Sequence, residues 1–267
     1  MSATAPTLAA RAWHALRQCF WKAYFHLRVV GRHRLPLAGP MILCANHTSH
    51  LDAPAILAAL PRHPALRTRT AAACDVFFRG GPLARLAGRL FSRALPLARR
   101  GHFPAGLRDL ERALRAGHPL ILFPEGTRSP NGALGDFHSG AAMLSLRTGA
   151  PIIPIHLAGP RAALPRAARL PDPFDVTVRI GQPLFPPTPV KGSPAPTDHK
   201  HEARDRLTAD LRQAIASLGQ PTIIQRRPGR GARPAAFTHR PPTARHRALP
   251  YPSRPLSAKH PFPTGDC

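Results

Sequence analysis

The sequence predicts a single α/β domain in which helices flank a mixed, mostly parallel sheet. Short apolar runs bounded by turn residues alternate with longer segments of helical periodicity. Two polar motifs directly follow apolar runs, and ligands of such sheets gather beyond the carboxyl ends of strands. We expect an amphipathic helix before this domain and a disordered tail after it, which divides the chain into residues 1–34, 35–218 and 219–267.

The first segment, residues 8–30, has the pattern of one amphipathic helix. Its apolar residues recur at three- and four-residue steps, with arginine and lysine between them. The apolar positions are Leu8, Trp13, Leu16, Phe20, Tyr24 and Leu27, and Trp21 and Phe25 enlarge the aromatic cluster. A basic helix with an aromatic face is typical of segments that lie in a lipid headgroup layer. The alternative is a helix packed on the core with its arginines in solvent.

The remaining elements follow from apolar periodicity and from glycine and proline at their ends. Strands are expected at residues 40–45, 69–74, 94–97, 119–123, 151–157 and 175–180. Helices are expected at residues 53–60, 83–91, 105–116, 140–148 and 201–218. The Pro-rich segment 183–200 is expected to be a surface loop. Residues 220–267 are rich in proline and arginine and have few aliphatics, so we expect disorder there.

The composition narrows the function classes. A formal net charge of +25 favours polyanionic partners such as nucleic acid, anionic lipid or phosphorylated substrates, although arginine-rich usage also fits a GC-rich genome. The four cysteines form no CxxC pair, so the sequence indicates neither a zinc site nor a disulfide framework. No apolar run reaches the ~20 residues of a spanning helix, and the N-terminus has no secretory pattern. A membrane role is therefore expected to be peripheral.

The first polar motif contains His47 and Asp52, with four residues between them, and follows the strand expected at residues 40–45. Histidine is the usual general base because its unperturbed pKa lies nearest neutrality. At a strand-to-helix turn Asp52 can fold back onto the far ring nitrogen, hold the tautomer and stabilise the imidazolium. We therefore interpret the pair as catalytic, although a histidine at a strand end can also be a capping residue. His50 lacks a carboxylate at this spacing and is interpreted as structural.

The second polar motif follows the strand expected at residues 119–123. Gly126 permits tight backbone geometry, and Thr127 and Arg128 offer hydrogen-bond donors. An arginine fork matches phosphate oxygens bidentately. Glu125 could accept a hydrogen bond from a substrate hydroxyl or orient Arg128; the alternative is a loop salt bridge between Glu125 and Arg128 with no ligand.

Together these motifs resemble the lysophospholipid acyltransferases, the family of the bacterial 1-acylglycerol-3-phosphate acyltransferases. Four blocks occur in the family's order between about residues 20 and 218. They read NHTSHLD at 46–52, LPLARR at 95–100, FPEGTRS at 123–129 and APIIPIH at 150–156, with FHSG at 137–140 between the last two. The first block is similar to the family's catalytic NHxSxxD pattern, and the third matches its acceptor-binding block almost letter for letter.

The resemblance implies a role for each matching residue. His47 would be the base and Asp52 the residue that orients it, while Glu125, Gly126, Thr127 and Arg128 would bind the acceptor. Arg99 or Arg100 would bind the acceptor phosphate, although Ala98 stands where family members often have an acidic or polar residue. The family's acyl donors are acyl-CoA or acyl carrier protein thioesters. Neither a cofactor nor a metal is implied, and the expected place is the cytoplasmic side of the cell membrane.

The resemblance implies transfer of a fatty acyl group to a lysophospholipid, with 1-acyl-sn-glycerol-3-phosphate as the first expected acceptor and phosphatidate as product. Three alternatives stay open. The acceptor could be another lysolipid, such as a lyso-ornithine lipid. The basic tail could bind nucleic acid, although it has few aromatic residues for base stacking and no recognition motif. Hydrolysis, with water replacing the lysolipid, would be a third, but no GxSxG elbow is present.

Overall fold

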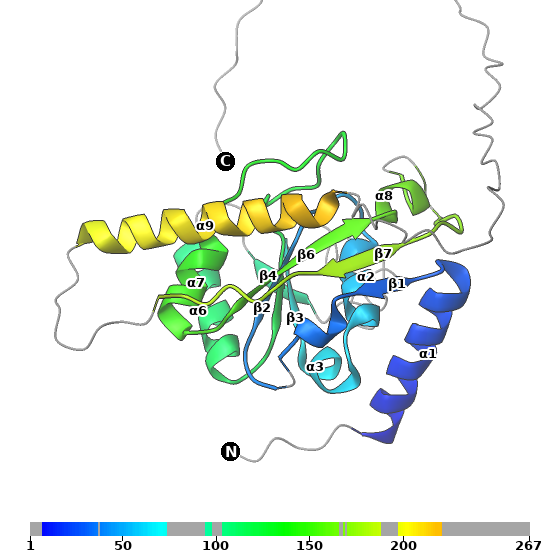
Figure 1. The fold of residues 1–267 in the computed structure, drawn as a ribbon. Helices are drawn as coiled ribbons and strands as arrows, with labels where there is room; N and C mark the ends of the chain where they lie inside the picture. The colour runs from blue at the N-terminus through cyan, green and yellow to red at the C-terminus, as the bar shows by residue number, and fades with distance from the viewer. Residues whose placement is uncertain are drawn as a thin grey trace, which may run out of the picture. The chain divides into compact units, whose positions relative to one another are not determined.

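The computed structural model describes residues 7–36, 38–73, 94–97, 103–165, 168, 170–187 and 197–220. All of them belong to the first of two units, Met1–Thr222 and Ile223–Cys267. Seven strands within these ranges form one sheet in the order β1-β7-β6-β2-β5-β3-β4 (Figure 1). They are β1 (Arg28–Val30), β2 (Ile42–Ala45), β3 (Arg69–Ala73), β4 (Ala94–Leu97), β5 (Leu120–Leu122), β6 (Ile152–Ala158) and β7 (Thr177–Ile180).

The sheet is mixed and mostly parallel, as the sequence predicts. The five strands from β6 to β4 run parallel to one another. Only β7 pairs in the antiparallel sense, against β6, and β1 then pairs in parallel with β7. Five parallel strands have their carboxyl ends at the same edge, which is where both polar motifs begin.

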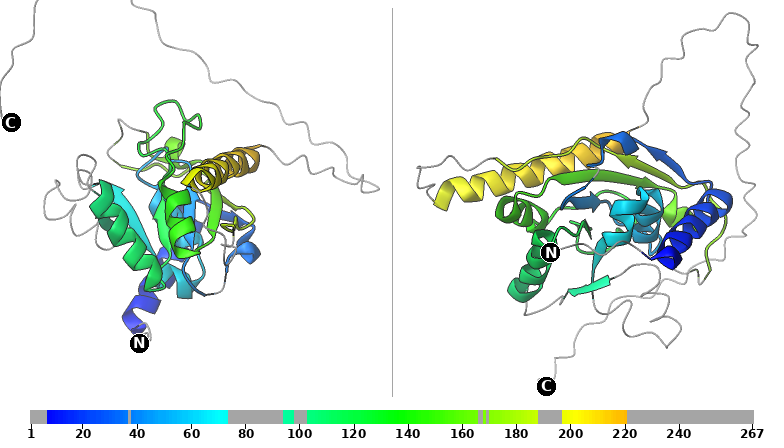
Figure 2. Two further views of the ribbon diagram at one scale, coloured as in Figure 1. Left: turned by 90° about the vertical axis from the view of Figure 1, so that its left-hand side faces the viewer. Right: turned by 90° about the horizontal axis from the view of Figure 1, so that it is seen from below.

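Helices cover both faces of the sheet, as two views at right angles show (Figure 2). On one face lie α1 (Leu8–Tyr24), α2 (Asp52–Ala59) and α3 (Arg62–Arg67), and on the other lie α6 (Phe103–Arg115), α7 (Gly140–Thr148) and α9 (Thr197–Gly219). Successive strand residues point to opposite faces. Leu43 and Ala45 of β2 therefore pack in the first cluster, and Ile42 and Cys44 in the second. This double coverage explains why the central strands are continuously apolar.

The chain leaves β2 and β5, which are neighbours, on opposite faces of the sheet. The connection after β2 carries α2 and α3 and leads to β3, beyond β5. The connection after β5 carries α7 on the other face and leads to β6, beyond β2. In sheets with such a reversal, ligands bind outside the carboxyl ends of the two strands. Residues 46–52 and 123–129 directly follow β2 and β5 at this edge.

Most elements agree with the sequence prediction, and α7 and β4 agree residue for residue. The single helix predicted for residues 8–30 is wrong at its end. The helix ends at Tyr24, His26 adopts a left-handed conformation with φ of 42°, and β1 then joins the sheet. The predicted loop at 183–200 is also wrong at its end, because α9 begins at Thr197. The helix predicted for residues 83–91 lies outside the described ranges.

Helix α1 buries polar residues and exposes apolar ones. His14, Arg17 and Trp21 face the domain, whereas four large apolar residues of the helix are exposed. These exposed residues are Leu8, Trp13, Leu16 and Phe20. The expectation of a membrane-facing aromatic cluster is therefore wrong for Trp21 and Phe25, which pack in the core. The alternative reading, a helix whose arginines all lie in solvent, is wrong for Arg17.

The buried polar residues of α1 hold the helix on α2. Arg17 donates one hydrogen bond from Nη2 to His14 Nδ1 at 2.7 Å and one to the Leu57 carbonyl at 3.0 Å. The Gln18 amide donates to the Ala58 and Leu60 carbonyls, at the end of the same helix. These bonds specify the rotation of α1 about its axis, so the apolar residues are left facing outward. None of the helices in the described ranges is long and apolar enough to cross a membrane.

His14 is expected to make the domain less stable in acid. Burial, and then the positive charge of Arg17, lower the pKa of His14 to about 4. The unfolded chain takes up a proton near pH 6.5, whereas the folded protein does so only near pH 4. The contribution of neutral His14 to the free energy of unfolding is therefore fully present above pH 6.5. It is lost as the pH falls toward 4, by about 2–3 kcal/mol. Thermal unfolding between pH 4 and 7 should show a shallower pH dependence for His14→Gln; parallel curves would contradict this assignment.

Candidate active site

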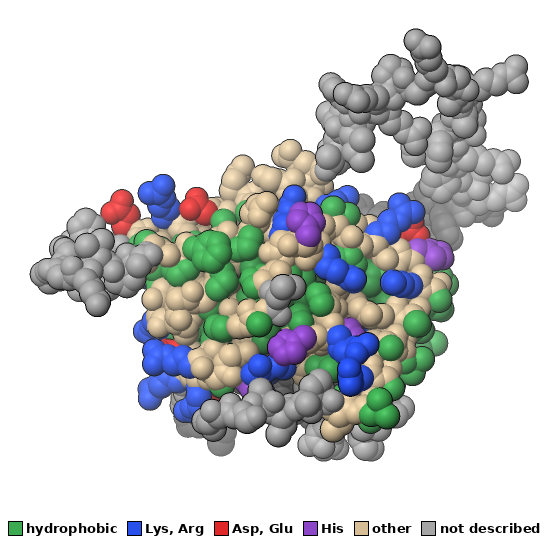
Figure 3. Space-filling view, turned by 60° about the horizontal axis from the view of Figure 1, so that its bottom comes forward, with side chains coloured by type: hydrophobic (Ala, Val, Ile, Leu, Met, Phe, Trp, Pro, Cys, Tyr) green, Lys and Arg blue, Asp and Glu red, His purple; other side chains and the backbone are tan. Residues whose placement is uncertain are grey.

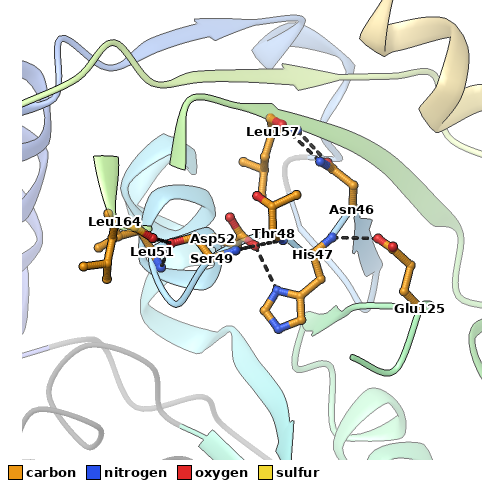
Figure 4. Close-up of polar contacts among 9 residues, drawn as sticks. All are labelled: Asn46, His47, Thr48, Ser49, Leu51, Asp52, Glu125, Leu157 and Leu164. Carbon is orange, nitrogen blue, oxygen red and sulfur yellow. Dashed lines mark hydrogen bonds and ion pairs between the residues drawn. The ribbon is translucent and has the colours of Figure 1, made fainter. Parts of the chain in front are cut away.

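His47 and Asp52 form a hydrogen-bonded pair at the carboxyl end of β2 (Figure 4). The distance between His47 Nδ1 and Asp52 Oδ2 is 2.8 Å. Because a carboxylate oxygen can only accept, Nδ1 carries the proton and Nε2 is left as the acceptor of the ring. The pair is asymmetric in its exposure: the Asp52 side chain is 0 % exposed and that of His47 is 21 % exposed.

The turn after β2 and the start of α2 place Asp52 beneath the histidine. Asp52 is the first residue of α2, where the helix dipole favours negative charge. Its Oδ2 also accepts the backbone N–H groups of Thr48 at 2.6 Å and Ser49 at 2.8 Å. Three donors thus converge on one buried oxygen. The spacing of four intervening residues is what allows the helix start to fold back under the preceding turn.

The His47 ring stacks on the Phe123 ring, and this contact fixes the plane of the imidazole. The two ring centroids are 4.0 Å apart with an interplanar angle of 17°. Phe123 follows β5, so the imidazole is held by one residue from each of the two segments, Asp52 after β2 and Phe123 after β5. Figure 4 shows Nε2 pointing away from Asp52. This arrangement leaves Nε2 as the free acceptor of a ring whose tautomer and orientation are defined and whose side chain is partly exposed.

Glu125 connects the second polar motif to the first. Its Oε1 accepts the backbone N–H of His47 at 2.8 Å, and its Oε2 accepts that of Gly135 at 3.1 Å. The side chain is buried. A second bond joins the same segments, because the Ser129 N–H donates to the His47 carbonyl at 2.7 Å. Glu125 thus holds the backbone of the histidine in place and fixes the loop that contains Gly135.

The three residues after Glu125 form the outer part of this loop. Gly126 has a φ of 68°, and a Cβ there would lie 3.1 Å from the His138 ring, so the turn requires glycine. Thr127 is exposed and Arg128 is half-buried. The positive charge of Arg128 acts on His50, which places its guanidinium in the electrostatic surroundings of the first motif. Two of the predicted residues, Arg99 and Arg100, lie outside the described ranges.

His50 differs from His47 in its surroundings. Partial burial, then the charges of Arg128 and His47, lower the pKa of His50 below its usual value of 6.5, and Asp52 opposes the shift. The carboxylate that could orient a base is bonded to His47 instead. The geometry therefore distinguishes the two histidines, because Asp52 orients His47 and not His50.

Asn46 is a structural residue of the site whose role the spacing did not indicate. Its side-chain amide donates to the Leu157 carbonyl at 3.1 Å, and its carbonyl oxygen accepts the Leu157 N–H at 2.8 Å. The side chain thereby continues the pairing of β2 with β6 by one residue beyond β2. Only its position beside His47 could have suggested a role, because the pairing of β2 with β6 is not visible in the sequence. Across the described ranges, no group of three or more His, Cys, Asp or Glu side chains is arranged to hold a metal ion.

The sequence model of the acyltransferase family matches residues 26–158, and the chain is therefore a member of that family. Within the family, the chain is 31% identical over 140 residues to the human 1-acyl-sn-glycerol-3-phosphate acyltransferase beta, covering 51% of this chain and 48% of that protein. It is 37% identical over 73 residues to a chloroplastic 1-acyl-sn-glycerol-3-phosphate acyltransferase of Brassica napus, covering 27% of this chain and 21% of the relative. The chain thus spans about half or less of the length of these relatives.

A solved structure has a similar fold. The crystal structure of the 1-acyl-sn-glycerophosphate acyltransferase from Thermotoga maritima superposes with a TM-score of 0.55 at 24% identity. The match covers 77% of this chain and 80% of that one. This similarity supports the α/β architecture of the fold.

Proposed function

We propose that the protein transfers a fatty acyl group from a thioester to the free hydroxyl of a lysophospholipid, most directly 1-acyl-sn-glycerol-3-phosphate, to give phosphatidate. The observation that carries this proposal is the His47–Asp52 pair, joined through Glu125 to the loop that contains Arg128. The relatives named 1-acyl-sn-glycerol-3-phosphate acyltransferase support the choice of acceptor.

In the proposed reaction His47 is a general base and no enzyme nucleophile is needed. His47 Nε2 takes the proton of the acceptor hydroxyl while the oxygen of that hydroxyl attacks the thioester carbonyl carbon. Asp52, whose Oδ2 accepts from Nδ1, stabilises the imidazolium that results. The tetrahedral intermediate then collapses, the carbon–sulfur bond breaks, and the leaving thiolate takes the proton back from Nε2. The products are the acylated lipid and the free thiol, and the base is restored.

The acceptor phosphate is proposed to bind at Arg128, together with Arg99 or Arg100. Gly126 and Thr127 would form the wall of the acceptor site in the same loop. Glu125 would act indirectly, because each of its oxygens already accepts a backbone N–H from the surrounding segments. A lyso-ornithine lipid or another lysolipid is the alternative acceptor, and it would not require a phosphate clamp.

The acyl donor is proposed to be acyl-CoA or an acyl carrier protein thioester, and neither a metal nor a further cofactor takes part. Both donors are polyanionic, and the net charge of +25 would attract either. The exposed apolar face of α1 would rest in a membrane surface, on the cytoplasmic side, where the lipid acceptor is found. Nucleic-acid binding has no supporting observation in the described residues.

The direct test is an assay of the purified chain with a panel of lysolipids and both thioester types. The proposal requires turnover with lysophosphatidate and at least one donor. It also requires much weaker turnover when the acceptor phosphate is removed, as in a monoacylglycerol. Equal turnover with and without the phosphate would reject the phosphate clamp and favour another acceptor. Release of free fatty acid without acceptor acylation would identify a hydrolase instead.

Replacing Arg128 with alanine should weaken binding of the acceptor selectively. A charge-assisted bond to phosphate contributes about 1.5–3 kcal/mol, so the acceptor's KM should rise by roughly 10–100-fold. The donor's KM should change much less. Arg108, an exposed residue of α6, provides a matched control for loss of one positive charge. Equal increases in both KM values, or the same result for Arg108→Ala, would place Arg128 outside the acceptor site.

A further inference from the structure

The segment between α8 (Pro160–Ala163) and β7 exposes two large apolar side chains that the reaction does not use. Leu170 is 79% exposed and Phe174 is 48% exposed. We infer that residues 170–175 form a second membrane contact beside α1, and that the two contacts together turn the candidate active site toward an anionic lipid bilayer. The inference rests on the membrane association proposed above for α1.

Hydrogen bonds hold this segment against the end of α1. The Tyr24 hydroxyl donates to the Pro171 carbonyl at 2.9 Å, and His26 pairs with Asp175 at 2.8 Å. The Tyr24 ring in turn stacks on the exposed Phe20 ring, with centroids 5.3 Å apart and an interplanar angle of 11°. The exposed residues of α1 and those of the segment therefore belong to adjoining parts of one surface. Figure 3 shows hydrophobic side chains along the edge of the domain where α1 lies.

The same segment is attached to the site. The Asp172 N–H donates to the Ala163 carbonyl at 2.8 Å, at the end of α8. The next residue, Leu164, accepts a bond from the Ser49 hydroxyl at 3.3 Å. Ser49 lies in the catalytic motif and donates its backbone N–H to Asp52. The segment is thus at the carboxyl end of the parallel strands, which is also where His47 lies.

A single helix on a membrane leaves the domain free to rotate about the helix axis. A second contact away from that axis removes this freedom. The two contacts differ in chemistry. At 100° per residue, Arg11 and Lys22 fall on one flank of the apolar face of α1, and both are exposed. The segment carries two carboxylates, Asp172 and Asp175, so its contribution must come from Leu170 and Phe174 entering the lipid rather than from charge.

The test is flotation of the full chain with vesicles of phosphatidylcholine and phosphatidylglycerol in equal parts. The double variant Leu170→Ser, Phe174→Ser should bind about tenfold more weakly, because two apolar side chains lose their burial in lipid. Its remaining binding should still weaken with salt, because the cations of α1 are unchanged. Phe185→Ser is the matched control: Phe185 is 69% exposed but follows Leu184, which pairs with the opposite end of β6. Wild-type binding by the double variant, or an equal loss in the control, would overturn the inference.

A second measurement does not depend on loss of binding. Tryptophan in place of Phe174 should gain quenching by brominated acyl chains beyond that of the two native tryptophans, whereas tryptophan in place of Phe185 should not. Absence of the extra quenching at position 174 would equally reject the contact. Neither measurement requires turnover, so a failure of the proposed acyl transfer would be recognised separately. Turnover of a short-chain, monomeric lysophosphatidate by the double variant should match that of the wild-type protein.

Discussion

Replacing His47 with alanine should lower kcat by roughly 10³–10⁴-fold, because the reaction would lose both its base and the proton donor to the leaving thiolate. The fold should be retained. The bonds that the backbone of His47 makes with Glu125 and Ser129 do not involve the imidazole. Single-turnover kinetics with saturating acceptor and donor would measure the loss directly, and circular dichroism would report the fold.

Two other histidines provide comparisons for this variant. His33 lies exposed in the short 3-10 helix Arg32–Arg34, and its replacement by alanine should leave turnover unchanged. His50→Ala should cost far less than His47→Ala, because His50 is not the histidine that bonds Asp52. If His50→Ala were the inactive variant and His47→Ala retained activity, the assignment of the base would be wrong.

Asp52→Asn is expected to separate the charge of this residue from its hydrogen bonds. The asparagine oxygen can take the place of Oδ2 and accept the same three N–H donors, so the geometry of the turn should persist. The imidazolium would lose its counter-charge, and kcat should fall by roughly 10²–10⁴-fold. The melting temperature should fall less than in Asp52→Ala, even though the amide NH2 would occupy the buried place of Oδ1, which has no hydrogen-bond partner in the described part of the chain.

Asp52→Ala provides the contrast to this variant. Removal of the carboxylate leaves the N–H groups of Thr48 and Ser49 buried without an acceptor. Each unsatisfied group costs about 1–3 kcal/mol, so the free energy of unfolding should fall by about 2–5 kcal/mol as well as kcat. Urea unfolding and kcat of the two variants would be compared. Full activity in Asp52→Asn would show that charge at this position is dispensable.

The central sheet and the His47–Asp52 pair follow from local sequence signals. Each strand is a short apolar run between turn residues, and the pair needs only one turn of chain between β2 and α2. The sequence also places both motifs at strand ends, which the parallel strand order brings to one edge. These features could be predicted because they depend on neighbours a few residues away.

Other features depend on contacts between distant segments and could not be predicted. The periodicity of α1 identified an apolar face but not its direction, which is decided by Arg17 and Gln18 bonding to α2. The role of Asn46 depends on Leu157, which is 111 residues away. The carboxylate of Glu125 was expected to meet a substrate or Arg128, whereas its two oxygens accept backbone N–H groups from two other segments.

Because Glu125 bonds the His47 backbone, the choice of acceptor headgroup can change without a change in the proton-transfer residues. Glu125 bonds the backbone of the histidine, and the second bond from this loop comes from the Ser129 backbone N–H, so no side chain of residues 126–134 is needed to support His47. Side-chain variation in that stretch can therefore alter which headgroup is accepted while His47 and Asp52 keep their positions. An exchange of loops between relatives of this protein should accordingly begin after Glu125 and end before Gly135, whose N–H completes the same support.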